Sequence, residues 1–305
     1  MIRKALVAFA VLCAAPSFAQ SRESEGILLL AHGGAPDWNQ RVVALATSID
    51  ATQPVEVAFG MASRPTIQAA VDKLVARGVA SIVAVPLFIS SHSSVLTSTA
   101  YLLGVRPDAP PELRVFAKMN HGAHGGAATT GHEGHGVTEP AVDNTRPVTS
   151  PVPIRMTEAL NRHRLVGEIL IDRAREVSTS PDKEAVIVVA HGPVPEDDNN
   201  RWLEDMKVLA EQMDDATSFA AIKYLTVRDD APKPIRDTAT TELRQLVAEQ
   251  SSLGRRVLIV PLLLSYGGIE KGVRQRLEGL DYVMATRALM PDDRLREWVQ
   301  QSVAK

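Results

Sequence analysis

The sequence predicts an α/β fold built from two tandem domains of similar size, each an open parallel sheet flanked by helices. Three observations lead to this prediction. The chain has 305 residues, of which 45% are hydrophobic and 23% charged, so it is long enough for two globular domains. One pattern of apolar runs occurs twice along the chain. Within each copy the apolar runs alternate with amphipathic segments, which is typical of a parallel sheet with helical connections.

The first strand of each copy is predicted at residues 26–33 and 185–192, where a continuous apolar run ends in Ala-His-Gly. A run without polar alternation indicates a strand that is buried on both faces. An amphipathic helix should follow each strand. The two helices start with the same residue types in the same order, namely Pro36, Asp37, Asn39 and Arg41 against Pro195, Asp197, Asn199 and Arg201.

The remaining elements of the two copies also correspond in order. They are second strands at 55–59 and 221–225, helices at 65–77 and 234–249, third strands at 81–88 and 256–263, fourth strands at 114–119 and 282–285, and closing helices at 154–177 and 292–303. We therefore expect two domains, at residues 26–178 and 184–305, that face each other across a cleft.

The first copy carries an extra segment, residues 120–153, which we call the His-rich insert. It is rich in glycine and contains His121, His124, His132 and His135. Because it follows a predicted strand, we expect it to leave from the carboxyl edge of the sheet, where open α/β sheets bind ligands, and to cover the site. Its imidazoles could gather metal loosely, or the segment could be a linker without preformed geometry.

Two histidines, His32 and His191, lie at the predicted carboxyl ends of the first strands, each before a glycine that lets the backbone turn away. A histidine there can act as a neutral metal ligand or as a proton acceptor near neutral pH. The alternative is a histidine that only completes the turn. Because a histidine occurs at the same place in both copies, a functional role is favoured.

The loops after the third strands contain His92 and Glu270, which we expect near His32 and His191, respectively. Two imidazoles, or an imidazole and a carboxylate, suit Co²⁺, Fe²⁺, Ni²⁺ or Zn²⁺. Alternatively, His92 belongs to a polar turn and Glu270 is a first-turn helix acid. Acids at 196–198 and 229–230 flank the second site and could attract cations.

Residues 1–19 have the pattern of a secretory signal, with Arg3 and Lys4 before an apolar run and Ser17-Phe18-Ala19 at its end, so we expect export to the periplasm. The single cysteine, Cys13, lies in this segment, so any metal must be held by histidine and oxygen ligands. No later run approaches the roughly 20 apolar residues that a membrane span needs. A net charge of −3 argues against nucleic-acid binding, and no phosphate-binding glycine loop suggests a nucleotide.

Three motifs, at residues 27–33, 55–59 and 82–88, together resemble the class II tetrapyrrole chelatases, specifically the sirohydrochlorin cobaltochelatases and ferrochelatases. The resemblance implies a chelatase fold, insertion of a divalent metal into a tetrapyrrole without ATP, and a metal-binding, catalytic role for His32. In the second copy, Glu270 after Ile269 resembles the Ile-Glu of protohaem ferrochelatases, whose acid partners a histidine that matches His191. The resemblance thus implies His32, His191 and Glu270 as catalytic residues.

The chain departs from the family pattern at two places. Ser94 stands where the family usually has a histidine, with His92 two residues earlier, and Gly60 and Met61 replace a common glutamate. These departures keep two other functions open. One is a non-catalytic periplasmic protein that binds or delivers divalent metal on a chelatase fold, and the other is a tetrapyrrole carrier without metal chemistry.

Overall fold

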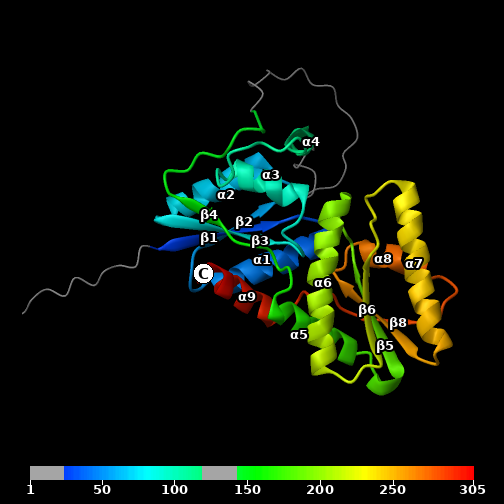
Figure 1. Ribbon diagram of the computed structural model, residues 1–305. Coiled ribbons are helices and arrows are strands. Elements are labelled where there is room, and N and C mark those ends of the chain that lie inside the picture. Colours follow the sequence, from blue (N-terminus) through cyan, green and yellow to red (C-terminus); the bar gives the residue numbers. More distant parts are fainter. Residues whose placement is uncertain (1–23, 119–142) are drawn as a thin grey trace, which may run out of the picture.

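The computed structural model describes residues 24–118 and 143–305 (Figure 1). It contains two four-stranded parallel sheets. The first has the order β2 (Val55–Phe59), β1 (Glu25–Ala31), β3 (Ser81–Leu87) and β4 (Ile154–Met156). The second has the order β6 (Ala221–Thr226), β5 (Glu184–Ala190), β7 (Arg256–Leu262) and β8 (Val283–Met284). The predicted fold class, two parallel α/β units in tandem, is confirmed.

The central strands β1 and β5 are buried on both faces, as their unbroken apolar runs indicate. In β1, Ile27, Leu29 and Ala31 enter one core, whereas Leu28 and Leu30 enter another, because successive strand residues point to opposite faces. Each sheet therefore needs helices on both sides to cover it.

The helices are α1 (Pro36–Asp50), α2 (Arg64–Ala76), α3 (Ser94–Leu102), α4 (Leu113–Lys118), α5 (Arg164–Arg175), α6 (Glu196–Ala216), α7 (Lys233–Ser252), α8 (Ile269–Arg276) and α9 (Asp293–Val303), with a short 3-10 turn at Pro181–Lys183. Local sequence explains several of their starts. Proline lies in the first turn of α1, α2 and α7, where no backbone donor is lost. The side chains of Ser93 and Asp292 cap α3 and α9 by accepting backbone N–H groups.

The predicted fourth strand of the first half is wrong. Residues 114–118 lie in helix α4, and β4 is formed instead by Ile154–Met156, the start of the predicted closing helix. Leu113 and Phe116 are buried while Val115 is exposed, and this spacing of three gives one apolar helix face rather than strand alternation. The closing helix itself, α5, begins at Arg164.

The His-rich insert therefore follows a helix and not a strand, so the reason for placing it over the carboxyl edge is wrong. Its histidines lie outside the described residues. Its described end, residues 143–153, runs beside α2, where Arg64 Nε donates to Arg146 O at 3.0 Å and Gln68 Nε2 donates to Thr149 O at 2.8 Å. It then enters the amino end of β4, where Ile82 N donates to Pro153 O at 2.9 Å.

The closing helices of the two halves are exchanged. Helix α5 belongs to the first half but packs against α6 and β7 of the second, whereas α9 packs against α1 and β3 of the first. Figure 1 shows α9 beside α1, far from the sheet that precedes it in the chain. The predicted division at residues 178–184 therefore separates the two sheets, but each sheet borrows its last helix from the other half.

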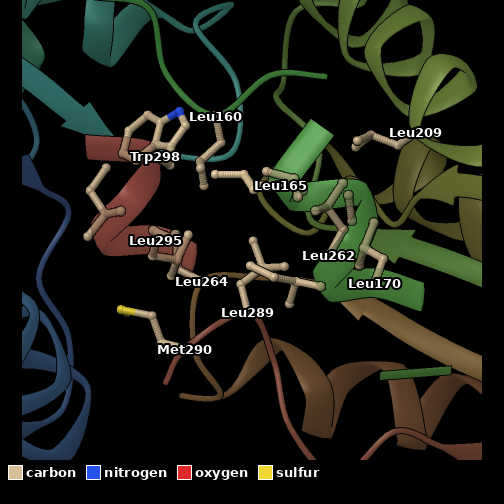
Figure 2. Packing of buried hydrophobic residues seen from close by; sticks show 14 of the residues in the cluster. Leu160, Leu165, Leu170, Leu209, Leu262, Leu264, Leu289, Met290, Leu295 and Trp298 are labelled. Carbon is tan, nitrogen blue, oxygen red and sulfur yellow. The ribbon is translucent and has the colours of Figure 1, made fainter. Parts of the chain in front are cut away.

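This exchange creates one apolar core that is shared by both halves. Figure 2 shows Trp298 and Leu295 of α9 in the same cluster as Leu165 and Leu170 of α5. Trp298 is only 1% exposed. Separate cores lie on the outer faces, one under α2 and one under α7 and α8. The hydrophobic effect thus holds the two sheets together through the shared core.

Glycine is required at the turn after each first strand. Gly33 and Gly192 have φ angles of 84° and 77°, in the left-handed region that side chains disfavour. At Gly192 the constraint is stronger, because a Cβ atom would lie 2.5 Å from Thr226 Cβ, whereas at Gly33 its nearest neighbour would be 3.5 Å away. The turn that follows His191 is therefore closed to any side chain.

We expect Gly192→Ala to lower the free energy of unfolding by about 2 kcal/mol, since it adds a backbone penalty of about 1–2 kcal/mol and a steric overlap. Gly33→Ala, which meets the backbone penalty without the overlap, should cost less. Urea denaturation of both variants measures the difference. Equal losses would show that the Thr226 contact does not constrain the turn.

Among the described residues, no helix is long and apolar enough to span a membrane. Residues 1–19, where we expect a secretory signal, lie outside the described part of the chain.

Candidate functional site

Reciprocal hydrogen bonds join the two halves at the carboxyl edges of their sheets. From α1 of the first half, Arg41 NH1 donates to Ser265 Oγ at 2.6 Å, in the loop after β7. From α6 of the second half, Trp202 Nε1 donates to His92 O at 2.8 Å, in the loop after β3. The first helix of each half, α1 or α6, thus contacts the loop after the third strand of the other half. These loops contain or lead into the predicted site residues His92 and Glu270.

His32 follows the last residue of β1 and is exposed. Its Nδ1 atom lies 2.7 Å from Gly33 O, a geometry in which Nδ1–H donates to the carbonyl. The neutral imidazole then has its lone pair on Nε2. His32 therefore offers a free nitrogen at the sheet edge, able to bind a metal or accept a proton.

His92 is half-buried, and its loop is held from two sides. Its own N–H donates to Ser90 Oγ at 3.2 Å. The neighbouring Ser91 is tied to the loop after β4, because its N–H donates to Asn161 Oδ1 at 2.7 Å and its Oγ accepts from Ala159 N at 2.9 Å. Together with the bond from Trp202, these contacts fix the backbone at His92.

His191 pairs with an acid that the sequence placed at the rim of the second site. Its Nε2 lies 3.4 Å from Asp230 Oδ2, and its carbonyl accepts from Arg228 N at 2.7 Å. A carboxylate next to an imidazole orients the ring and favours the proton on the nitrogen that faces it. His191 therefore presents Nδ1 as the nitrogen available to a ligand.

Glu270, in the first turn of α8, is 8% exposed. Its Oε2 accepts from Gly267 N at 3.1 Å and from Gly268 N at 2.9 Å. Burial acts to raise the pKa of this carboxyl, but backbone hydrogen bonds, with those from Gly268 and Gly267 the largest, and the charge of Lys271 together outweigh it, so the net pKa is lowered. Glu270 thus closes the start of α8 as an ionised acid, as the first-turn alternative expects; its role as a ligand stays a prediction.

The strands that carry the predicted pairs are neighbours, since β1 pairs with β3 and β5 with β7. Even so, no hydrogen bond or ion pair joins His32 to His92, or His191 to Glu270, all of which the structure describes. Within the described ranges, no group of three or more His, Cys, Asp or Glu residues is arranged to hold a metal ion. The two ligand pairs therefore stay predictions.

Sequence reasoning missed Asp205, a buried acid on α6 that lies one helical turn from Trp202. Burial raises its pKa, while the charges of His92 and Arg162 act against that rise. No local pattern marks Asp205, because its neighbours belong to the other half of the chain. The repeat gives no signal either, because the corresponding position on α1 is the apolar Leu45.

The family model CbiX matches residues 26–177, which include β1, His32 and His92. Residues 26–177, the first half of the chain, therefore belong to the CbiX family, in agreement with the resemblance to class II chelatases. Among curated proteins, it is 24% identical to the sirohydrochlorin cobaltochelatase of Methanococcoides burtonii over 159 residues, which cover 51% of this chain and 98% of the relative. The relative is therefore about half as long as this protein.

Three solved structures share the fold over 92% of the chain. SirB from Bacillus subtilis with Fe³⁺ has a TM-score of 0.60 at 14% identity, covering 92% of this chain and 94% of SirB. SirB from Bacillus subtilis subspecies spizizenii in complex with cobalt gives 0.57 at 13% identity over the same shares. DR2241 from Deinococcus radiodurans gives 0.51 at 16% identity, with 92% of this chain and 55% of that protein covered. At identities of 13–16%, these similarities show a shared fold.

Proposed function

We propose that this protein is a metal chelatase that inserts Co²⁺ or Fe²⁺ into a tetrapyrrole such as sirohydrochlorin, without ATP. The observation that carries the proposal is His32, whose Nε2 lone pair is free at the carboxyl edge of β1, inside the half that the family model matches. The relative's name, a sirohydrochlorin cobaltochelatase, supports the choice of substrate. The expected signal at residues 1–19 leads us to propose that the reaction takes place after export.

The protein must assist two steps of metal insertion. The ion must exchange water for protein ligands, and the macrocycle must lose two pyrrole protons. The free imidazole nitrogen of His32 suits both tasks, as ligand and as base. In the second half, His191 with Asp230 forms an imidazole–carboxylate pair that suits a general base. We propose His32 and His92 as the first-half ligands and His191 and Glu270 as the second-half pair.

The test is to mix the purified protein with sirohydrochlorin and Co²⁺ and to follow the change in absorbance. We expect insertion faster than the spontaneous reaction, and a loss of about 100-fold or more in His32→Ala, as for other proton-transfer residues. Added imidazole should restore part of the lost rate in His32→Ala and leave the wild type unchanged.

If the wild-type protein does not accelerate insertion of Co²⁺ or Fe²⁺ into any tetrapyrrole tested, the enzymatic proposal fails. The alternative of a metal-binding or delivery protein then makes its own prediction. Deleting residues 120–136, which contain His121, His124, His132 and His135, should lower the stoichiometry of Co²⁺ binding. A chelatase should instead keep its turnover at saturating metal after this deletion.

A further inference from the structure

A cavity of about 350 Å³ lies at the carboxyl end of β6, between residues of α6 and α7. Its volume is in the range of small-molecule sites. One wall is formed by Asn199 of α6, by Thr226 at the end of β6 and by Arg228 in the loop that follows, and each of them is only 5% exposed. Open α/β sheets bind ligands at this edge, so the cavity combines a buried polar wall with the expected position of a ligand.

Arg228 is both strained and incompletely bonded. Its φ angle is 53°, a left-handed conformation that a residue other than glycine keeps only where its surroundings impose it. NH1 donates to Glu196 Oε2 at 3.0 Å and NH2 donates to Val194 O at 2.7 Å, which ties the loop after β6 to the start of α6. Nε is buried and has no hydrogen-bond partner within the described structure. Because a buried donor without an acceptor is costly, a ligand that accepts from Nε would complete the site.

The charges around the cavity favour a ligand with a single negative charge. Arg228 is the only cation among the lining residues, all of which the structure describes, while Glu196 and Glu242 line the cavity from exposed positions. A dianion such as phosphate would meet these two acids with one guanidinium to offset them. A carboxylate carries one charge, and its two oxygens match the planar fork of an arginine. Thr226 Oγ1 donates to Asn199 Oδ1 at 2.6 Å, which leaves the Nδ2 group of this amide as a further donor.

Apolar side chains line the rest of the cavity, namely Leu203, Leu225, Ile235 and Ala239. We propose that the cavity binds an aliphatic carboxylate, whose head group accepts from Arg228 and Asn199 and whose hydrocarbon chain packs on these apolar side chains. The ligand is a free small acid or an acid side chain of a larger molecule bound at the neighbouring His191, whose carbonyl accepts from Arg228 N at 2.7 Å.

The test is a titration of the full chain with sodium butyrate, followed by saturation-transfer NMR. We expect saturable binding, and binding of n-butanol at least about 10-fold weaker, since its hydroxyl cannot replace a charged acceptor. Asn199→Asp keeps the acceptor for Thr226 but replaces the amide donor with a negative charge, so it should weaken butyrate binding about 10-fold or more. The matched control is Asn200→Asp, the same change at the next, exposed residue, which should leave the affinity unchanged.

Glu242→Gln tests the same site without changing a buried residue. Removing this exposed acid should strengthen butyrate binding about 2-fold, the size of effect that is usual for exposed charges. Glu249→Gln, on the same helix but outside the cavity lining, should have no effect. The proposal is overturned if butyrate shows no saturable binding, if butyrate and n-butanol bind equally, or if neither Asn199→Asp nor Glu242→Gln changes the affinity.

A second arm of the experiment identifies the source of the carboxylate. Sirohydrochlorin, which carries carboxylate side chains, and its methyl ester are added in turn to the protein saturated with butyrate. Displacement of butyrate by sirohydrochlorin but not by the ester assigns the cavity to an acid side chain of the tetrapyrrole, whereas retention of butyrate assigns it to a free small acid. Because no metal is added, these results are independent of the insertion assay.

Discussion

Replacing Arg173 with methionine is expected to lower the free energy of unfolding by about 3–5 kcal/mol, the cost of breaking a buried, hydrogen-bonded charge. The Arg173 side chain is 2% exposed. Its guanidinium donates to Ala288 O at 2.7 Å and to Leu289 O at 3.2 Å, and it pairs with Asp292 Oδ2 at 3.1 Å. Methionine would fill part of the volume but leave these acceptors buried without their donor.

The position of Arg173 makes this loss larger than that of an ordinary ion pair. Arg173 belongs to α5, while residues 288–292 lead from β8 into α9, so the contact holds the chain where the second half crosses to the first sheet. Urea denaturation measures the effect. The matched control is Arg287→Met, which removes a half-exposed partner of Glu176 and should cost less than about 1 kcal/mol. Similar losses for both variants would contradict a special role for the buried arginine.

Acid should destabilise the protein between about pH 4.5 and pH 2 through Glu184, the first residue of β5. This side chain is 1% exposed, and it accepts from Ser178 Oγ, from Thr179 N at 2.9 Å and from Arg256 NH1 at 2.6 Å. Burial acts to raise the pKa of the carboxyl, but the hydrogen bonds outweigh it and lower the pKa from 4.5 to about 2.

Because the pKa is lower in the folded state, the carboxylate contributes its stability above the unfolded value of 4.5 and loses it as the pH falls towards 2. A shift of this size corresponds to about 3 kcal/mol. We therefore expect the difference in unfolding free energy between wild type and Glu184→Gln to shrink across this window. Glu211→Gln, at an exposed pair with Lys207, should differ little from wild type at any pH. A constant difference for Glu184→Gln from pH 5 to pH 2 would disprove the assignment.

The sheets were predictable because their information is local. Unbroken apolar runs at residues 26–31 and 185–190 mark strands buried on both faces, and Gly33 and Gly192 mark the turns that end them. The same local signals placed His32 and His191 at the carboxyl edges, where the structure has them. The expectation of His92 near His32, and of Glu270 near His191, requires the third strand to lie beside the first, and β1 does pair with β3 and β5 with β7.

The fourth strand of the first half was not predictable by analogy with the second half. Residues 114–118 match the β8 region in order, yet their burial follows a helical spacing, and Ile154–Met156 takes the edge of the sheet. A strand of three residues is too short to show a period of its own. Its identity depends on pairing with β3, a contact across about seventy residues of chain.

The sequence by itself determined two parallel α/β units, each with a His-Gly turn at the carboxyl end of a buried strand. Strand burial and glycine turns depend on residues that are neighbours in the sequence. Only the tertiary structure decided that the closing helices are exchanged and that α1 and α6 each contact the other half's loop. These features depend on which apolar faces bury each other across the whole chain. Amphipathic helices such as α5 and α9 show that one face must be covered, but not by which sheet.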